Sequence, residues 1–296
     1  MPPPASTPFE IISTPRELLR YPRSIFVPTM GGFHEGHTSL IDLASRLASQ
    51  RTPTPPVLVS VFVNPTQFDE PDDYERYPRV LENDARRSRE HGASCVFAPD
   101  VETIYPSQSD ITSPPPPDSI RGIGLEDTYR PGHLEGVWQV VHRLFRLIQP
   151  SVAVFGEKDW QQLQMITQLA DLMRTTGEAD VRIEPGPTIR EPDGLAMSSR
   201  NRFIPPDLRP SAASLSNAMR VAQTIDNPDE ASETMRDLML DATIDVEYAT
   251  IRDARTIRPL PESTRRNDRG LVARSFVAGR LGDTRILDNM PWSPAT

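Results

Sequence analysis

Hydrophobic and polar positions along this chain follow two recurring patterns. Short apolar runs, rich in β-branched and aromatic residues, predict buried strands at 24–29, 57–63, 94–99, 151–156 and 180–185. Between them, apolar residues recur at helical spacing in 37–50, 133–148 and 159–174. Strands that alternate with amphipathic helices at this spacing predict an α/β fold, with a parallel sheet and helices on both of its faces.

The pattern changes after about residue 186. Two helices are predicted at 205–225 and 229–242, followed by antiparallel strands at 246–252, 270–279 and 284–288. Helices followed by strands are typical of a smaller α+β domain. We therefore predict two domains, 1–186 and 187–296, and 296 residues are enough to give each a hydrophobic core.

Composition and charge exclude several classes of protein. With 32 basic and 41 acidic residues the formal net charge is -9, so a general nucleic-acid binder is not expected. No apolar run approaches the roughly 18 residues of a membrane span, and the first ten residues lack the features of a secretory signal. The single cysteine excludes a disulfide framework. We expect a soluble cytoplasmic protein that binds neither membranes nor nucleic acid.

One count among the cations is unusual. Lys158 is the only lysine among the 32 Lys and Arg residues. A codon bias towards arginine explains this count, and so does a chemical need for an ammonium group at one position. Both explanations stay open on the sequence alone.

The segment VPTMGGFHEGH (27–37) is the first candidate site. A strand ends here, glycines turn the chain and a helix starts near His37, which is where ligands bind in parallel sheets. Unpaired N–H groups at the new helix form a natural anion site, and Gly31, Gly32 and Gly36 allow close approach. His34 and His37 lie on one helical face and can donate to phosphate oxygens. The alternative is a glycine turn with two incidental histidines; a zinc protease needs spacing i, i+4 instead.

A second candidate, FGEKDWQQL (155–163), also follows a predicted strand. Gly156 ends the strand, and Glu157, Lys158 and Asp159 come before a helix, at the same edge of the sheet as the first motif. A lysine there suits a polyphosphate. A capped helix with a surface ion pair is the simpler alternative.

Two further segments are weaker candidates when taken alone. DGLAMSSRNRF (193–203) lies at the predicted domain junction, and its hydroxyls and arginine could close over a nucleotide. VFVNPTQF (61–68) places the amides of Asn64 and Gln67 after a strand, where they suit a small polar substrate or simply form a turn. The polar run at 72–87 predicts only a solvated helix.

Taken together, five ordered blocks resemble the pantothenate synthetase (pantoate–β-alanine ligase) family, a branch of the nucleotidylyl transferases marked by His-x-Gly-His. The blocks are PTMGGFHEGH, FVNPTQF, RPGHLEGV, FGEKDWQQL and DGLAMSSRNR, and the resemblance covers nearly the whole chain. It implies a Rossmann-like ATP-binding domain, a C-terminal lid domain, Mg²⁺ dependence and a homodimer. The implied reaction joins pantoate to β-alanine through pantoyl adenylate and releases AMP and pyrophosphate.

The resemblance also implies roles for individual residues. Catalysis is expected from His34, His37 and Lys158, with His37 as the proton donor. The implied ATP site comprises Met30, Gly31, Gly32, Phe33, His34, Glu35, Gly36, His37, Gly156, Glu157, Lys158, Asp159, Gly186, Met197, Ser198, Ser199 and Arg200. Gln67 and Gln162 are expected to bind pantoate, Gln67 also lies against β-alanine, and Asn64 is a further substrate-binding candidate.

The chain also departs from the family. Where some relatives carry an acidic run, this chain has Glu82, Asn83 and Asp84, so we assign no protein ligand to a metal and expect ATP to carry Mg²⁺. Proline-rich insertions at 52–56 and 113–118 suggest a eukaryotic, fungal member and are expected on the surface. Two alternatives remain: another nucleotidylyl transferase, which leaves AMP on a phosphorylated vitamin precursor, and a non-catalytic nucleotide-binding protein.

Overall fold

The computed structural model describes residues 9–107 and 113–294, so most of the stretch tested for a secretory signal lies outside it. The chain divides into two compact units. The first comprises residues up to 116, 130–157 and 165–187, and the second comprises 117–129, 158–164 and the residues from 188 onwards. The domain boundary predicted at 186/187 lies beside the last change of unit, but two earlier segments also belong to the second unit.

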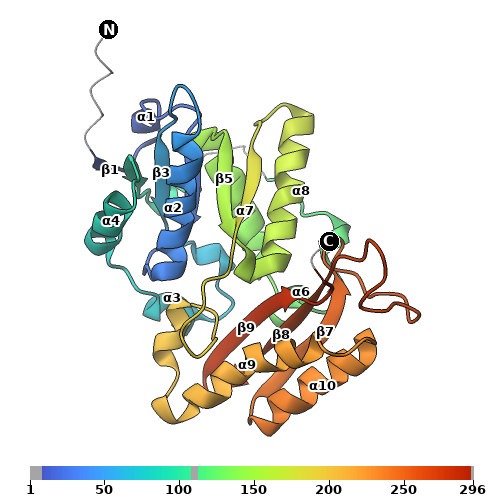
Figure 1. Ribbon diagram of the computed structural model, residues 1–296. Coiled ribbons are helices and arrows are strands. Elements are labelled where there is room, and N and C mark those ends of the chain that lie inside the picture. The colour runs from blue at the N-terminus through green and yellow to red at the C-terminus, as the bar shows by residue number, and fades with distance from the viewer. Residues whose placement is uncertain (1–8, 108–112, 295–296) are drawn as a thin grey trace. The chain divides into compact units, whose positions relative to one another are not determined.

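A parallel six-stranded sheet forms the centre of the first unit (Figure 1), in the order β1-β4-β3-β2-β5-β6. Its strands are β1 (Glu10–Ile12), β2 (Ile25–Thr29), β3 (Val57–Val61), β4 (Cys95–Phe97), β5 (Val152–Gly156) and β6 (Arg182–Gly186). Five strands agree with the sequence prediction, and the short β1 was not predicted. The α/β class is confirmed.

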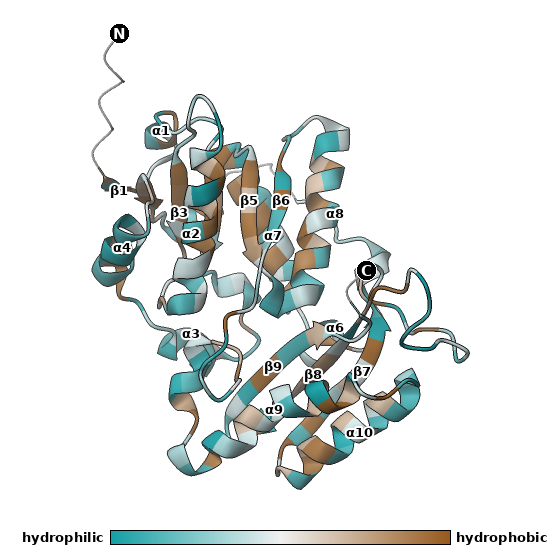
Figure 2. Cartoon of the chain, viewed as in Figure 1, coloured by the Kyte–Doolittle hydropathy of each residue, from teal (hydrophilic) through white to brown (hydrophobic). Residues whose placement is uncertain are grey.

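Strand alternation explains why helices cover this sheet. Ile25 and Val27 of β2 pack with Ile41 and Ala44 of α2 (Glu35–Ser49) on one face. On the other face Phe155 of β5 meets Phe145 of α7 (His133–Ile148), with ring centroids 6.3 Å apart. The central strands are accordingly the most hydrophobic part of this unit (Figure 2). The remaining elements are α1 (Pro15–Leu18), η1 (Pro65–Gln67), α3 (Pro71–Arg76), α4 (Leu81–Glu90), α5 (Val101–Ile104), η3 (Glu157–Asp159) and α8 (Trp160–Thr176). Of these, η3 and α8 each have residues in both units.

The second unit has an antiparallel sheet in the order β7-β8-β9. Its strands are β7 (Asp245–Asp253), β8 (Ala273–Leu281) and β9 (Thr284–Pro291), and its helices are η2 (Asp118–Ile120), α6 (Glu126–Tyr129), η4 (Ser199–Phe203), η5 (Pro206–Leu208), α9 (Arg209–Ala222) and α10 (Pro228–Asp241). Leu215 of α9 and Met235 of α10 share a core with Val277 of β8 on one face. This matches the predicted α+β class.

The opposite face of this small sheet explains the two inserted segments. Phe276 of β8 and Tyr248 of β7 pack with Ile123 and Leu125 from 117–129 and with Trp160 from 158–164. Both segments therefore bury apolar side chains on the C-terminal sheet, although they come before residue 188, where the continuous part of this unit begins.

The proline-rich segment 113–118 is less superficial than expected. Trp138 is buried and donates its indole N–H to the Pro114 carbonyl at 2.6 Å, and Pro116 is buried. Ser113 Oγ lies 3.0 Å from His142 Nδ1. The first part of this insertion is thus fixed to α7. Within residues 9–107 and 113–294, every helix is too short or too polar to cross a membrane.

Candidate active site

The carboxyl ends of neighbouring strands bring several predicted residues to one edge of the parallel sheet. Thr29, at the end of β2, pairs with Val61 at the end of β3, and Gly156 pairs with Gly186 at the ends of β5 and β6. A Cβ at position 186 would overlap a terminal methyl group of Leu40, so the Leu40 side chain would have to shift to admit any other residue there. In the first unit this edge carries 30–37, 64–67 and 156–157, as the sequence predicted.

The glycine turn after β2 is held by a residue that the sequence analysis treated as solvated. Gly31 and Gly32 have φ of +87° and +67°, a conformation that favours glycine. Asp84 is fully buried, and its carboxylate accepts the N–H groups of Gly32 at 2.8 Å and Phe33 at 3.0 Å. Arg87 of the same helix donates to the Phe33 carbonyl at 2.6 Å. Helix α4 therefore clamps the turn that precedes the histidines.

The two histidines of the turn are locked in a defined tautomer. His34 caps α2, and its Nδ1 accepts the Gly36 N–H at 3.1 Å. His37 Nδ1 accepts the His34 N–H at 3.3 Å, and the two ring centroids lie 4.1 Å apart. A backbone N–H can only donate, so each neutral ring carries its proton on Nε2. Both imidazoles are therefore Nε2–H donors.

This arrangement differs from the anion site that the sequence predicted. The backbone N–H groups of Gly32, Phe33, His34 and Gly36 already donate to side chains. The turn therefore positions the imidazoles, and its engaged backbone N–H groups do not form the anion site that the sequence predicted.

Asn64 and Gln67 form one buried unit after β3. Asn64 is 1% exposed, and its Nδ2 donates to Gln67 Oε1 and to the Gly136 carbonyl, both at 3.1 Å. Its Oδ1 accepts from Tyr105 Oη at 2.9 Å. Because both ends of its amide are occupied, we assign Asn64 to orienting Gln67 rather than to substrate contact. The bond to Oε1 fixes the Gln67 amide, whose Nε2 makes no hydrogen bond to any described residue.

The block RPGHLEGV explains how this segment is held. Arg130 donates to Asp69 Oδ1 at 2.9 Å, and His133 Nδ1 donates to the Gln67 carbonyl at 2.8 Å. A Cβ on Gly136 would collide with the Thr66 carbonyl. Burial by itself would raise the pKa of Asp69, but the hydrogen bond and the charge of Arg130 lower it by more. The pKa is therefore below its ordinary value, and the pair is charged. On the sequence alone this block carries the family resemblance, and its supporting role becomes visible only in the structure.

Other predicted residues belong to the second unit, namely Lys158, Asp159, Gln162 and 197–200. Lys158 lies in η3 with 21% of its side chain exposed, and its Nζ is 3.3 Å from Asp159 Oδ1. Ser198 caps η4, and its Oγ accepts the Arg200 N–H at 3.3 Å. The structure thus gathers the predicted ATP residues as two groups, one in each unit.

Adjacent glutamines at the start of α8 have different surroundings. Gln161 is buried, and its Oε1 accepts the Glu126 N–H at 3.0 Å while its Nε2 donates to Asp127 at 3.2 Å. Gln162 is half-buried and makes no hydrogen bond within the described part of the chain. Gln161 is therefore structural, and Gln162 is the one of the two with amide groups left for a substrate.

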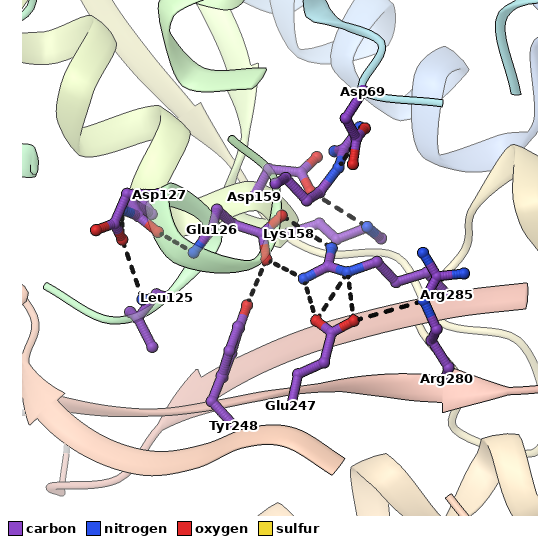
Figure 3. A network of polar contacts seen from close by, with 12 residues as sticks. Asp69, Leu125, Glu126, Asp127, Lys158, Asp159, Glu247, Tyr248, Arg280 and Arg285 are labelled. Carbon is purple, nitrogen blue, oxygen red and sulfur yellow. Dashed lines mark hydrogen bonds and ion pairs between the residues drawn. The ribbon is translucent and has the colours of Figure 1, made fainter. Parts of the chain in front are cut away.

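A buried charge network fixes 117–129 to the small sheet (Figure 3). Arg285 donates to both carboxylate oxygens of Glu126, at 2.6 and 2.9 Å, and to Glu247 at 2.7 Å. Tyr248 Oη donates to Glu126 at 2.7 Å. Burial disfavours the charged guanidinium, but Glu126 and Glu247 outweigh it and raise the pKa of Arg285. The carboxylates of Glu126 and Glu247 are ion-paired with Arg285, so we do not consider them candidates for catalysis.

The described side chains form no cluster that could by itself hold a metal ion. Among residues 9–107 and 113–294, no three His, Cys, Asp or Glu side chains are grouped so that they could hold one. Asp84, which contacts the glycine turn, is engaged with backbone N–H groups. Mg²⁺ often keeps its waters and binds mainly to substrate phosphates, so we assign it no ligand from this chain.

Comparisons with known proteins agree over nearly the whole chain. The profile of the pantoate–β-alanine ligase family matches residues 10–291. Pantothenate synthetase from Nocardioides sp. is 42% identical over 275 residues, which cover 90% of this chain and 77% of the relative. The enzyme from Mycolicibacterium smegmatis is 39% identical over 290 residues, covering 96% and 86%. These relatives do not support the expected eukaryotic origin.

Solved structures show the same fold. Pantothenate synthetase from Thermus thermophilus superposes with a TM-score of 0.84 at 37% identity, covering 96% of this chain and all of that one. Pantoate–β-alanine ligase from Francisella tularensis, complexed with β,γ-ATP and β-alanine, has a TM-score of 0.74 at 29% identity, covering 96% and 98%. With a family profile and relatives that match almost every element described above, the chain belongs to the pantoate–β-alanine ligase family.

Proposed function

We propose residue roles for the reaction that this family catalyses. The chain is an ATP-dependent ligase that joins pantoate to β-alanine. A relative crystallised with an ATP analogue and β-alanine supports the choice of both substrates here. What remains to be assigned is how the side chains of this sequence divide the work.

The reaction has two balanced steps. A pantoate carboxylate oxygen attacks the α-phosphorus of ATP, a P–O bond forms, and pyrophosphate leaves. The amine of β-alanine then attacks the acyl carbon of pantoyl adenylate, an amide bond forms, and AMP leaves while the amine loses a proton. In the first step two anions must meet, so catalysis consists mainly of positioning and charge stabilisation.

On the phosphate side we assign His34, His37 and Lys158. The two Nε2–H groups donate to phosphate oxygens without a change of protonation state, because the Nδ1 atoms are engaged by backbone N–H groups. Lys158 supplies a full positive charge to the same anion. Met30, Gly156 and Gly186 line the nucleotide, and 197–200 closes over it.

On the acid side we assign Gln67 and Gln162. Asn64 fixes the Gln67 amide with Nε2 available, so Gln67 donates to an oxygen of pantoate and also borders the β-alanine site. Gln162 supplies a second amide. Both are neutral, so they orient a carboxylate without reducing its nucleophilicity as strongly as a cation would.

Three features of the working enzyme complete the proposal. Bound to the ATP phosphates, Mg²⁺ would neutralise part of their charge, with no ligand assigned from this chain. The enzyme works in the cytoplasm as a homodimer. Each of these rests on the family resemblance of the five sequence blocks.

The observation that carries these roles is the pair of Nε2–H histidines that follows β2, together with the oriented Gln67 that follows β3, the strand paired with β2. Isotope exchange tests it. With pantoate, ATP and Mg²⁺ but no amine, labelled pyrophosphate should exchange into ATP only when pantoate is present. If labelled pyrophosphate exchanged into ATP without pantoate, or if the product retained AMP, the result would favour the activity of a different nucleotidylyl transferase.

A further inference from the structure

We propose that Asp288 and Asn289, two consecutive residues of β9, are positioning residues that hold both nucleotide-binding segments of the second unit. The segments are 158–159, with the lone lysine, and 197–200. The proposal rests on the nucleotide-binding roles proposed above for Lys158 and for 197–200. It adds a part of the site that none of the five sequence blocks contains.

Asn289 holds the main chain at the lysine. It is 2% exposed, and its Nδ2 donates to the Lys158 carbonyl at 2.7 Å. Its Oδ1 accepts from Arg274 Nε at 2.8 Å, and the Arg274 guanidinium stacks 3.7 Å from the Trp160 ring centroid. Because Arg274 can only donate, it fixes which end of the Asn289 amide faces Lys158. Asn289 therefore holds the residue before Asp159, and Arg274 contacts the residue after it.

Asp288 holds the other segment through Arg190. Asp288 is 2% exposed, and its carboxylate accepts two hydrogen bonds from the Arg190 guanidinium, at 2.5 and 3.0 Å. Arg190 also donates to the Gly194 carbonyl at 3.1 Å, and its backbone pairs with Ala196. This fixes the hairpin from which Met197 enters the 197–200 segment.

Strand geometry lets one strand serve both segments. Consecutive residues of a strand point to opposite faces, and directly paired residues of neighbouring strands share a face. Asp288 pairs with Val277, which faces the α9 and α10 core. Asn289 pairs with Phe276, which faces the Trp160 cluster. The hairpin at 190–196 and the lysine segment are thus held from opposite faces of β9.

Charge links the same residues. Burial raises the pKa of Asp288, while Arg190 and, more weakly, Lys158 oppose that rise. The Asp288 carboxylate is therefore close enough to sense the lysine ammonium as well as its own arginine. A pair that served only the packing of β9 would not need to bind one segment directly and the hairpin that leads into the other through Arg190.

Asn289→Ala in the full-length enzyme tests the proposal. We expect single-turnover formation of pantoyl adenylate to slow by about 10- to 100-fold, because a displaced Lys158 no longer meets the phosphates. A second readout uses the lone lysine. In the wild type, ATP should protect Lys158 from an amine-directed reagent, followed by peptide mass spectrometry, and in the variant protection should need about tenfold more ATP or more.

Asn227→Ala is the matched control. Asn227 caps α10 in the same unit by accepting the N–H groups of Asp229 and Glu230, and within the described part of the chain it makes no hydrogen bond to either segment. It should lower stability and leave adenylation and lysine protection at the wild-type level. If Asn289→Ala behaves like this control, Asn289 only stabilises the fold and the proposal is overturned.

Two further variants keep the result unambiguous. If Asn289→Ala does not fold, Asp288→Asn decides, because it keeps the shape while weakening the bond to Arg190; normal ATP protection in that variant overturns the proposal. Lys158→Ala tests the underlying role by itself. Normal adenylation by Lys158→Ala would refute the role of the lysine, whereas loss there with normal Asn289→Ala and Asp288→Asn would refute only the positioning.

Discussion

Replacing Asp84 by asparagine should separate the geometry of the glycine turn from the chemistry of the histidines. The carboxylate accepts the N–H groups of Gly32 and Phe33 immediately before His34. Asparagine has almost the same shape, but only its oxygen can accept. One of the two N–H groups would then face an amide NH₂ group, so one hydrogen bond is lost and a buried donor is left without a partner.

The size of the effect follows from these two bonds. A hydrogen bond to a charged group contributes about 1.5–3 kcal/mol, and an unpaired buried donor adds a penalty of similar size. Relaxation of the turn recovers part of this, so we expect Asp84→Asn to lower the free energy of unfolding by about 3 kcal/mol. A turn shifted by about 1 Å misaligns the imidazoles, so adenylation should slow by about 10- to 100-fold.

Both quantities are measurable on the same preparation. Denaturant unfolding gives the stability, and single-turnover adenylation, well below the unfolding temperature, gives the rate. Asp100→Asn is the control, because Asp100 also accepts a backbone N–H, from Thr103 at 2.7 Å, but caps an exposed helix where asparagine serves equally well. A large loss of stability with an unchanged rate would show that the turn does not control the histidines.

Substitutions at three other positions test separate parts of the structure. Lys158→Ala should reduce pyrophosphate exchange by about 10²–10³, and Lys158→Arg should stay impaired although it keeps the charge; normal exchange in either would contradict the assignment. Arg285→Leu leaves the Glu126 and Glu247 carboxylates buried without their cation, and should cost about 3–5 kcal/mol in denaturant unfolding; a cost under about 1 kcal/mol would mean the network is solvated. Burial lowers the pKa of His142 below its ordinary value of 6.5, so as the pH falls the unfolded chain takes up a proton before the folded chain does. The free energy of unfolding should therefore decrease below about pH 6.5, by up to about 1.4 kcal/mol per pH unit. If His142→Gln shows the same slope, His142 is not the cause of this pH dependence.

The elements that the sequence predicts well are those with a strong local pattern. The runs at 57–63 and 151–156 are apolar enough to be central strands of a parallel sheet, and they are β3 and β5. The edge strand β1 was missed, because three residues beside a polar segment carry no periodicity. The placement of 117–129 and 158–164 on the small sheet also escaped prediction, since it depends on the partners of Trp160 and Leu125 rather than on local spacing.

The same distinction applies within the site. Sequence order places His34 and Gln67 after strands, which is a topological inference, and the structure agrees. It cannot show that Asp84, within a polar run, is fully buried, because its partners lie about fifty positions away. One signal was available in the sequence. The block at 130–137 belongs to the family pattern but has no assigned role in catalysis or binding, so it could have been expected to hold another block in place. Arg130 and His133 hold the segment around Gln67 through Asp69 and the Gln67 carbonyl.

The lone lysine can now be argued from its surroundings. A codon bias explains why other cations are arginines, but such a bias acts equally at position 158. There the main chain is held by Asn289 and the side chain is only partly exposed, so the length and shape of the cation determine where its charge lies. A planar guanidinium anchored at the same carbonyl would place its donors farther from the backbone and in a fixed fork. An ammonium can instead follow the phosphate oxygens as charge moves from the α-phosphate to the leaving pyrophosphate, which is why retention of lysine here points to chemistry rather than to composition.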